Sequence, residues 1–175
     1  PLLESAVRRQ MAEAAARLCA DQSYGGAGTV EFVLDADTQE YFFLEMNTRI
    51  QVEHPVTEMN TGCDLVAMQI EHALGRLPAM TQSDVRAQGH AVECRIYAEN
   101  PAKNFLPSPG RLLKFKLPPP THSVRIDSGF RDGDEVSHFY DPMIAKVICH
   151  VATRDEAIDP DIEVLGSIEV EGPGT

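Results

Sequence analysis

Two glutamates and an asparagine lie on two β-type segments that are close together in the sequence. Residues 29–34 and 41–46 are rich in β-branched and aromatic side chains, and the polar stretch between them predicts a hairpin. If the hairpin is centred on Thr38, Glu31 lies opposite Glu45, and the strand period of two places Asn47 on the same face as Glu45. The pattern therefore predicts that three oxygen-bearing side chains converge.

Two carboxylates directly across a sheet repel each other, and a divalent cation between them would reverse the sign of that interaction. Oxygen ligands without His or Cys favour Mg²⁺ or Mn²⁺, and Mg²⁺ is commonly held by carboxylates together with substrate phosphates. Glu31, Glu45 and Asn47 are therefore predicted to form a metal and nucleotide-phosphate site. The alternative is a solvated strand face that carries two incidental glutamates.

Directly after these residues, Arg49, Gln51 and Glu53 alternate along the chain. In an extended segment the three side chains would point the same way, because successive residues of a strand face opposite sides. A cation, an amide and a base would then adjoin the predicted metal site.

The stretch from Phe43 to Glu58 resembles the signature of biotin carboxylases, including those within acetyl-CoA, propionyl-CoA, methylcrotonyl-CoA and pyruvate carboxylases. Most ATP-grasp ligases share only a shorter Glu-x-Asn pattern, whereas the Arg-Ile-Gln-Val-Glu-His extension is particular to the branch that uses bicarbonate. The resemblance covers roughly residues 1 to 158 and continues through three further motifs, which are His90–Ile96, Phe105–Gly110 and Tyr140–Lys146.

The resemblance implies a reaction in which ATP phosphorylates bicarbonate, the carboxyphosphate decomposes toward CO₂ and phosphate, and biotin N1′ is deprotonated and carboxylated. It also implies that Glu31, Glu45 and Asn47 belong to the metal and phosphate site. Arg49 would bind bicarbonate with Gln51 and the backbone amide of Val52. Glu53 would remove the bicarbonate proton, so Arg49 and Glu53 are the expected catalytic residues of this segment.

Arg95 lies in an alternating β-type run with Glu93 and Tyr97 on the same face. The resemblance implies that Arg95 is catalytic and binds biotin, because a fixed cation would stabilise the charge that develops on the ureido oxygen. The alternative is a surface ion pair between Arg95 and Glu93. Tyr140 and Asp141 are expected near the biotin pocket, although a turn role for Asp141 before a proline is an equal alternative.

Composition limits the classes of partner. A formal net charge of −12 disfavours nucleic acid, and no apolar run reaches the roughly 18 residues of a membrane span. The four cysteines are widely spaced, which indicates neither a zinc site nor a disulfide framework.

The resemblance implies ATP, Mg²⁺ or Mn²⁺ and carrier-bound biotin as ligands. It implies a biotin carboxyl carrier protein or domain, a carboxyltransferase component and possible homo-oligomers as partners. The expected location of the protein is the bacterial cytoplasm or the mitochondrial matrix, and not outside the cell.

The elements that must position these residues follow from periodicity. Apolar residues at spacings of three and four predict a helix with one buried face over residues 3–20. Asp64 is expected to cap a second helix, in which Val66, Ile70, Ala73 and Leu74 share a face. Short β-type runs follow at residues 91–97, 111–117, 123–126 and 143–150.

We therefore expect an α+β fold. Residues 1–80 would form the C-terminal part of an ATP-grasp domain, and residues 81–158 would form an incomplete, β-rich biotin carboxylase C-terminal domain. Residues 159–175 carry five acidic residues and no basic one, and Pro160 interrupts helix propagation, so a loosely ordered acidic tail is expected. The glycine-rich run 25–28 leads into a strand and is expected to be a turn rather than a phosphate loop.

The sequence is expected to be a piece of a longer reading frame, without the nucleotide lid and the N-terminal domain. A chain without a lid is expected to have negligible activity by itself, because ATP must be clamped between two lobes. Two other functions stay open: another ATP-grasp ligase, and an inert fragment that binds a partner carboxylase subunit.

Overall fold

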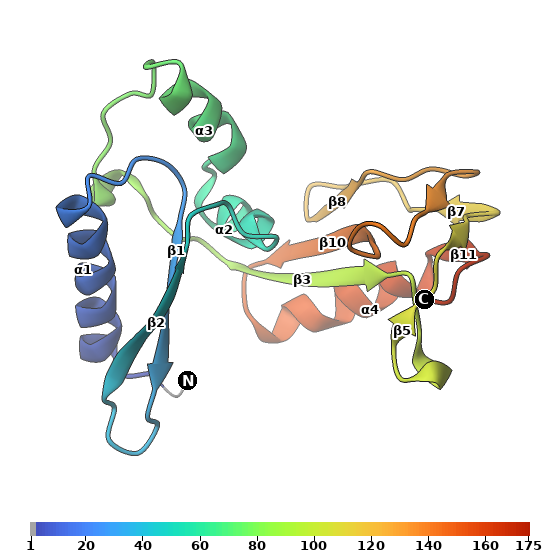
Figure 1. Cartoon of the computed structure of the whole chain (residues 1–175), viewed down its shortest axis with the longest axis horizontal. Helices are drawn as coiled ribbons and strands as arrows, with labels where there is room; N and C mark the ends of the chain where they lie inside the picture. Colours follow the sequence, from blue (N-terminus) through green and yellow to red (C-terminus); the bar gives the residue numbers. More distant parts are fainter. Residues whose placement is uncertain (1–2) are drawn as a thin grey trace. The chain divides into compact units, whose positions relative to one another are not determined.

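The computed structural model describes residues 3–175, apart from the side chains of residues 158–161. Its contacts divide the chain into two units, which are described separately. Unit 1 runs to His54 and resumes over Asp64–Met80, and unit 2 comprises Pro55–Cys63 and Thr81–Thr175. Helices and strands occur in similar amounts, as expected for an α+β fold (Figure 1).

Unit 1 contains a long helix and the predicted hairpin. Helix α1 spans Ser5–Asp21, and strands β1 (Thr29–Leu34) and β2 (Tyr41–Asn47) pair antiparallel. The polar turn between the strands is fixed by Asp35, whose Oδ1 accepts hydrogen bonds from the backbone N–H groups of Asp37 and Thr38. The predicted apolar stripe of α1 is only half-buried rather than buried.

The second helix of unit 1 begins where the sequence predicts. Helix α3 spans Leu65–Ala73, and Oδ1 of Asp64 accepts a hydrogen bond from the backbone N–H of Ala67 at 2.8 Å. The apolar face that the sequence predicts for this helix is largely exposed, as Val66, Ile70 and Leu74 are between 44% and 56% exposed. The more buried residues, such as Met68, lie on another side of the helix.

Unit 2 is built on an antiparallel sheet of three strands. Strand β10 (Met143–Val151) pairs on one side with β3 (His90–Tyr97) and on the other with β8 (Val124–Ser128). The predicted runs at residues 91–97, 123–126 and 143–150 are confirmed within a few residues. None of the helices in the part of the chain that the structure describes has the length and apolar character that a bilayer crossing requires.

The two faces of this sheet differ in character because side chains alternate along each strand. One face is apolar: Val147 and Cys149 are fully buried and pack with residues of helix α4 (Ile158–Gly166), including Val164 and Leu165. The other face carries charged side chains and includes a contact to helix α2 (His54–Thr61). Helix α2 is not among the elements that the sequence predicted.

A second core cluster lies among the short elements of unit 2, where Leu112, Val136 and Ile144 are 1% exposed or less. Asp132 supports this region by accepting a hydrogen bond from the backbone N–H of Phe115. The predicted strand at residues 111–117 is divided into two short strands. The short elements are η1 (Gln82–Asp84), β4 (Glu99–Asn100), η2 (Pro101–Lys103), β5 (Leu106–Pro107), β6 (Gly110–Arg111), β7 (Lys114–Lys116), β9 (Glu135–Val136), η3 (Asp155–Ala157) and β11 (Glu169–Glu171).

The expectation of a loosely ordered tail over residues 159–175 is wrong. Helix α4 continues through Pro160, which lies in the first helical turn, where a missing N–H costs no intrahelical hydrogen bond. Strand β11 pairs antiparallel with β7, and Lys114 forms ion pairs with Glu169 and Glu171. Within this segment, Glu169 and Glu171 are therefore balanced by Lys114 on the paired strand.

Gly172 gives a direct test of this ordered segment. Its φ of +123° is unfavourable for residues with a β-carbon, and an added β-carbon would collide with the carbonyl oxygen of Arg111. We expect Gly172→Ala to lower the free energy of unfolding by about 2 kcal/mol. Gly166→Ala is the control, because nothing lies within 4 Å of its added β-carbon. Urea denaturation of both variants checks this, and equal midpoints would mean that residues 169–175 are not ordered.

Candidate active site

The predicted convergence of three side chains on the hairpin is confirmed. Glu31 and Glu45 are register partners, and Asn47 Nδ2 donates to Glu31 Oε1 at 2.8 Å and to Glu45 Oε1 at 3.1 Å. A β-bulge between Glu31 and Phe32 shifts the register, so the pairing closer to the turn differs by one residue from a hairpin centred on Thr38. We refer to Glu31 and Glu45 as the carboxylate pair.

The donor set of the carboxylate pair fits a hard divalent cation. A single amide group lies within hydrogen-bond reach of both carboxylates, so their oxygens face one point. Turning the Asn47 amide over would present its oxygen there instead of its nitrogen, which adds a third oxygen ligand and gives up the hydrogen bond from Arg49 Nη2 to Asn47 Oδ1. Among the described residues no cluster of three His, Cys, Asp or Glu side chains could hold a metal ion, so other ligands would come from a bound phosphate.

Arg49 and Gln51 lie next to the carboxylate pair. Arg49 Nη1 donates to Gln51 Oε1 at 3.0 Å, and Arg49 Nη2 donates to Asn47 Oδ1 at 3.3 Å. The guanidinium is therefore held in a fixed orientation by residues on both sides of it in the sequence. A guanidinium beside an amide is suited to bind a small planar oxyanion.

The extended segment ends before Glu53. Val52 and Glu53 form a turn that leads into α2, and Glu53 is exposed. Contacts bear out the predicted common direction for Arg49 and Gln51. His54 has a structural contact, as its Nδ1 lies 2.9 Å from the carbonyl oxygen of Gln51.

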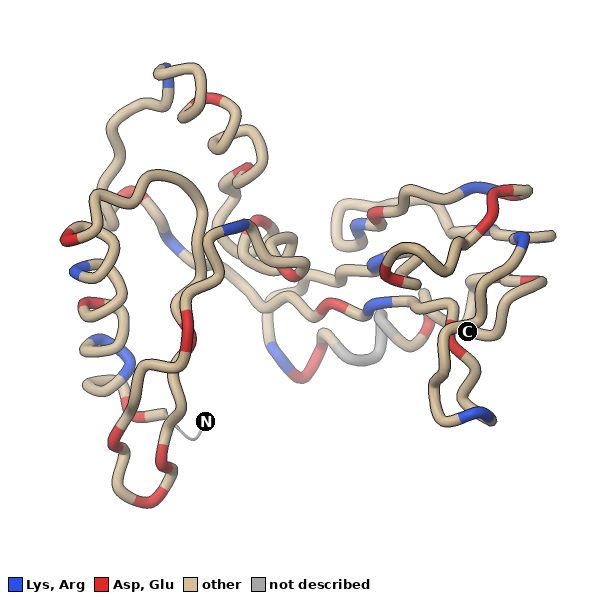
Figure 2. The backbone as a smooth tube through the Cα atoms, in the orientation of Figure 1, with Lys and Arg blue, Asp and Glu red and all other residues tan. Residues whose placement is uncertain are grey.

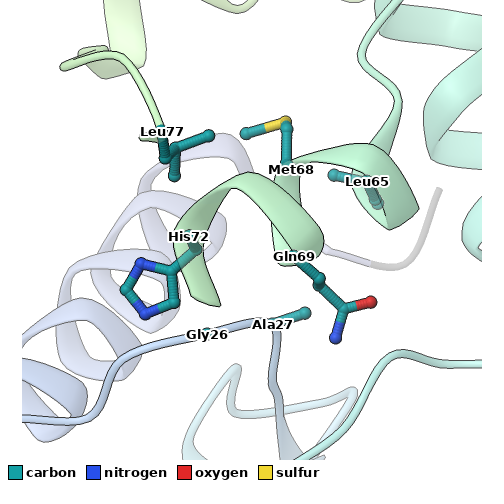
Figure 3. A pocket seen from close by; sticks show the side chains of 7 residues that line it. All are labelled: Gly26, Ala27, Leu65, Met68, Gln69, His72 and Leu77. Carbon is teal, nitrogen blue, oxygen red and sulfur yellow. The ribbon is translucent and has the colours of Figure 1, made fainter. Parts of the chain in front are cut away.

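The glycine-rich run forms a turn, as expected. An added β-carbon at Gly25 would lie 2.9 Å from Nε2 of His72, so glycine allows the turn to pack closely against α3. Beside this turn a cavity of about 170 Å³ opens (Figure 3), and its lining is mostly apolar. No predicted site residue lines this cavity, which is bounded by Gly26, Ala27, Leu65, Met68, Gln69, His72 and Leu77.

Arg95 lies on β3 in unit 2. Its Nε is 3.6 Å from Oε1 of Glu93, whose side chain is only 4% exposed, whereas the Arg95 side chain is 36% exposed. The ion pair between Arg95 and Glu93 that the alternative predicts is present, but its carboxylate is buried rather than at the surface. A cation that is anchored at its stem and accessible at its end can stabilise an anion on a bound substrate.

The loop before β10 carries the other two predicted biotin-facing residues. Tyr140 is 85% exposed, and Asp141 Oδ1 accepts a hydrogen bond from the backbone N–H of Met143 at 2.8 Å. Asp141 therefore has the turn role that the sequence left open. The geometry leaves Tyr140 accessible to a ligand.

Sequence reasoning missed a network of four charged residues on the charged face of unit 2. Arg125 donates to both oxygens of Asp127, at 2.8 and 2.9 Å, and its Nη1 donates to Glu58 Oε2 at 2.6 Å. Lys146 Nζ lies 3.6 Å from Asp127 Oδ2. The alternation of charges along residues 125–127 was visible, but Glu58 is 67 positions away and only the fold brings it to Arg125. The charged positions along the three strands are visible in Figure 2.

The network shifts the titration of its members. The hydrogen bond to Asp127 is the main cause that raises the pKa of Arg125. Burial by itself would raise the pKa of Asp127, but hydrogen bonds and charges from Arg125 and Lys146 outweigh it and hold the pKa below its usual range. Stability from this carboxylate is therefore present above the unfolded-state pKa of about 3.9 and is lost as the pH falls through the lower folded-state value.

Removing Arg125 is expected to destabilise unit 2. Glu58 is 8% exposed, so Arg125→Ala leaves a buried carboxylate without its guanidinium, and we expect a loss of about 2–3 kcal/mol in the free energy of unfolding at pH 7. Arg131→Ala removes an exposed arginine and should change stability by less than about 0.5 kcal/mol. Urea titrations at pH 7 check both variants, and an equal effect of the two would contradict the network.

Two protein-family models match the chain, one on each side of residue 80. The model for the carbamoyl-phosphate synthase L chain, ATP binding domain, matches residues 1–79. The model for the biotin carboxylase C-terminal domain matches residues 93–175, so it includes the segment that was expected to be a loose tail.

Curated relatives and solved structures agree with these models. "Biotin carboxylase 1" of Bacillus subtilis is 52% identical over 172 residues, which are 98% of this chain and 38% of that protein. The mitochondrial methylcrotonoyl-CoA carboxylase subunit alpha of Rattus norvegicus is 50% identical over 158 residues, or 90% of this chain and 22% of that protein.

A solved biotin carboxylase domain dimer of the Hydrogenobacter thermophilus 2-oxoglutarate carboxylase, in complex with MgADP, ADP and bicarbonate, has a TM-score of 0.90 and 38% identity. The similarity covers 98% of this chain and 38% of that one. This chain therefore spans less than half the length of each of these relatives.

Proposed function

The chain belongs to the biotin carboxylase family, and on that premise we propose that it supplies the metal-, bicarbonate- and biotin-facing residues for ATP-dependent carboxylation of biotin. The observation that carries the proposal is the carboxylate pair bridged by Asn47, with the Arg49 guanidinium held against the same asparagine. This arrangement combines a site for a phosphate-bound cation with a site for a small oxyanion.

Glu31, Glu45 and Asn47 would hold Mg²⁺ or Mn²⁺, which when bound neutralises charge that develops on the transferred phosphoryl group of ATP. The carboxylates alone repel nucleotide phosphates, so this part of the site is suited to a nucleotide only as its metal complex. The structure in complex with MgADP and bicarbonate, to which the chain is similar, supports the choice of ligands.

Arg49 would bind bicarbonate through its guanidinium, with the Gln51 amide and the backbone N–H of Val52 as further donors. The contact of Arg49 with Gln51 fixes this orientation before the substrate arrives, which lowers the entropic cost of binding. Glu53 would accept the bicarbonate proton, so that the bicarbonate oxygen can attack the γ-phosphorus and release ADP with formation of carboxyphosphate.

The carboxyphosphate would then decompose to CO₂ and trianionic phosphate. This phosphate would accept the N1′ proton of biotin, and the deprotonated N1′ would attack CO₂. Arg95 would stabilise the negative charge that develops on the ureido oxygen of biotin. Tyr140 would line the path of biotin, and Asp141 would hold the loop through its hydrogen bond to Met143. The biotin would arrive on a carrier protein or domain, and a carboxyltransferase component would consume the product.

A chimera tests this proposal, with the 175 residues replacing the matching segment of Bacillus subtilis biotin carboxylase 1. We expect the chimera to incorporate labelled bicarbonate into free biotin in an ATP-dependent manner. A folded chimera that binds ATP but fixes no label would contradict the proposal. Residues 1–80 contain no lysine to contact nucleotide phosphates, so a polypeptide of these 175 residues alone should show negligible turnover.

A further inference from the structure

The charged face of unit 2 brings Arg95 next to a second cation. In the register of β3, β10 and β8, Arg95 lies directly opposite Lys146, and Lys146 lies directly opposite Asp127. Register partners present their side chains to the same face of a sheet. Arg95 and Lys146 are therefore neighbouring cations on one face, with a carboxylate on the far side of the lysine.

Two like charges directly across a sheet are destabilising by themselves. Here each cation has its own carboxylate: Lys146 Nζ lies 3.6 Å from Asp127 Oδ2, and Arg95 Nε lies 3.6 Å from Glu93 Oε1. The two partners lie in different directions, since Asp127 is on the adjacent strand and Glu93 is on the same strand as Arg95.

The position of Lys146 is fixed more firmly than that of Arg95. The Lys146 side chain is 10% exposed, and its partner Asp127 is held by two hydrogen bonds from Arg125. Arg125 is in turn bound by the buried Glu58 of α2. Lys146 therefore cannot move aside without breaking its ion pair with Asp127, whereas the Arg95 side chain is 36% exposed and reaches the surface.

We propose that Lys146 is a positioning residue for biotin carboxylation, which holds the Arg95 guanidinium outward and adds positive potential where charge develops on the biotin ureido group. The proposal rests on the proposed function, because it requires that Arg95 faces biotin. It concerns only the biotin step, since Lys146 and Arg95 both belong to unit 2, whereas the carboxylate pair and Arg49 belong to unit 1.

The test is Lys146→Met in the chimera, with two activities measured. A methionine retains the length and apolar stem of the lysine but removes the charge. We expect kcat for carboxylation of free biotin to fall on the order of tenfold, because a fixed charge near the developing oxyanion is lost. Bicarbonate-dependent ATP cleavage without biotin should stay within about twofold, because no biotin charge develops in it.

Two further variants separate this role from a structural one. Lys146→Arg retains the cation and should recover most of the biotin carboxylation. Lys103→Met removes an exposed lysine from η2 and should leave both activities unchanged. Equal loss of both activities in Lys146→Met would show a general structural role and overturn the proposal, as would the absence of any loss. A chimera that fails to cleave ATP before any substitution would overturn the proposed function itself, and this inference with it.

Discussion

Replacing Glu53 by glutamine in the chimera is expected to lower kcat for bicarbonate-dependent ATP cleavage by a factor of about 10² to 10⁴, the range that a positioned general base contributes. Glutamine has the size of glutamate but cannot accept a proton. Because Arg49 and Gln51 stay in place, the KM for bicarbonate should change much less than kcat.

The matched control for this variant is Glu40→Gln, which replaces an exposed glutamate just before β2. It removes the same charge from unit 1, so it accounts for any effect of net charge on nucleotide binding. Steady-state rates of ADP release at saturating ATP check both variants. Equal activity of the Glu53→Gln and Glu40→Gln chimeras would show that Glu53 is not the general base.

Replacing Glu45 by glutamine should raise the concentration of Mg²⁺ needed for half-maximal activity by about tenfold and lower kcat by about a hundredfold, because one of two carboxylate ligands is lost. The glutamine oxygen can still accept the hydrogen bond from Asn47, so the hairpin should keep its structure. A kinetic titration with Mg²⁺ measures both parameters.

A second measurement on the same variant tests the physical basis of the metal site. Without metal the carboxylate pair carries two like charges at opposed positions, so Glu45→Gln should leave the free energy of unfolding unchanged or raise it by up to about 1 kcal/mol. Activity would then fall without any loss of stability. A marked loss of metal-free stability would indicate that Glu45 has a structural role instead.

The hairpin shows which part of the site can be predicted from local patterns. The period of two and the polar turn were enough to pair Glu31 with Glu45, and the contacts of Asn47 confirm their convergence. The bulge after Glu31 could not be predicted, because one extra residue in a strand has no distinct composition here. The register nearer the turn is therefore shifted by one residue.

Features that depend on distant contacts were missed. The face of α3 was assigned from its apolar residues, but Ile70 and Leu74 are more than half exposed. The acidic segment after residue 158 was expected to be loose, yet its helix packs Val164 and Leu165 against the sheet and its strand pairs with β7. Strand β7 is distant in sequence, and periodicity within the segment itself could identify neither β7 nor β10 as its partner.

The charged face of unit 2 also depends on contacts that local sequence patterns do not show, and these contacts bear on function. Arg95 and Lys146 both lie in motifs that the sequence analysis recognised. Arg95 was assigned a role from its motif, but Lys146 was not. The proposed positioning role of Lys146 follows from the strand register, which places it opposite Arg95, and from the charged network that reaches Glu58. Strand pairing of this kind is set by the fold and not by any local sequence signal.

We propose above that these residues couple bicarbonate to ATP cleavage. The most direct measurement is ADP release by the chimera in bicarbonate-free buffer and after addition of bicarbonate, without biotin. We predict that ADP release depends on bicarbonate and that this dependence is lost in Glu53→Gln. Equal rates of ADP release with and without bicarbonate would contradict the claim.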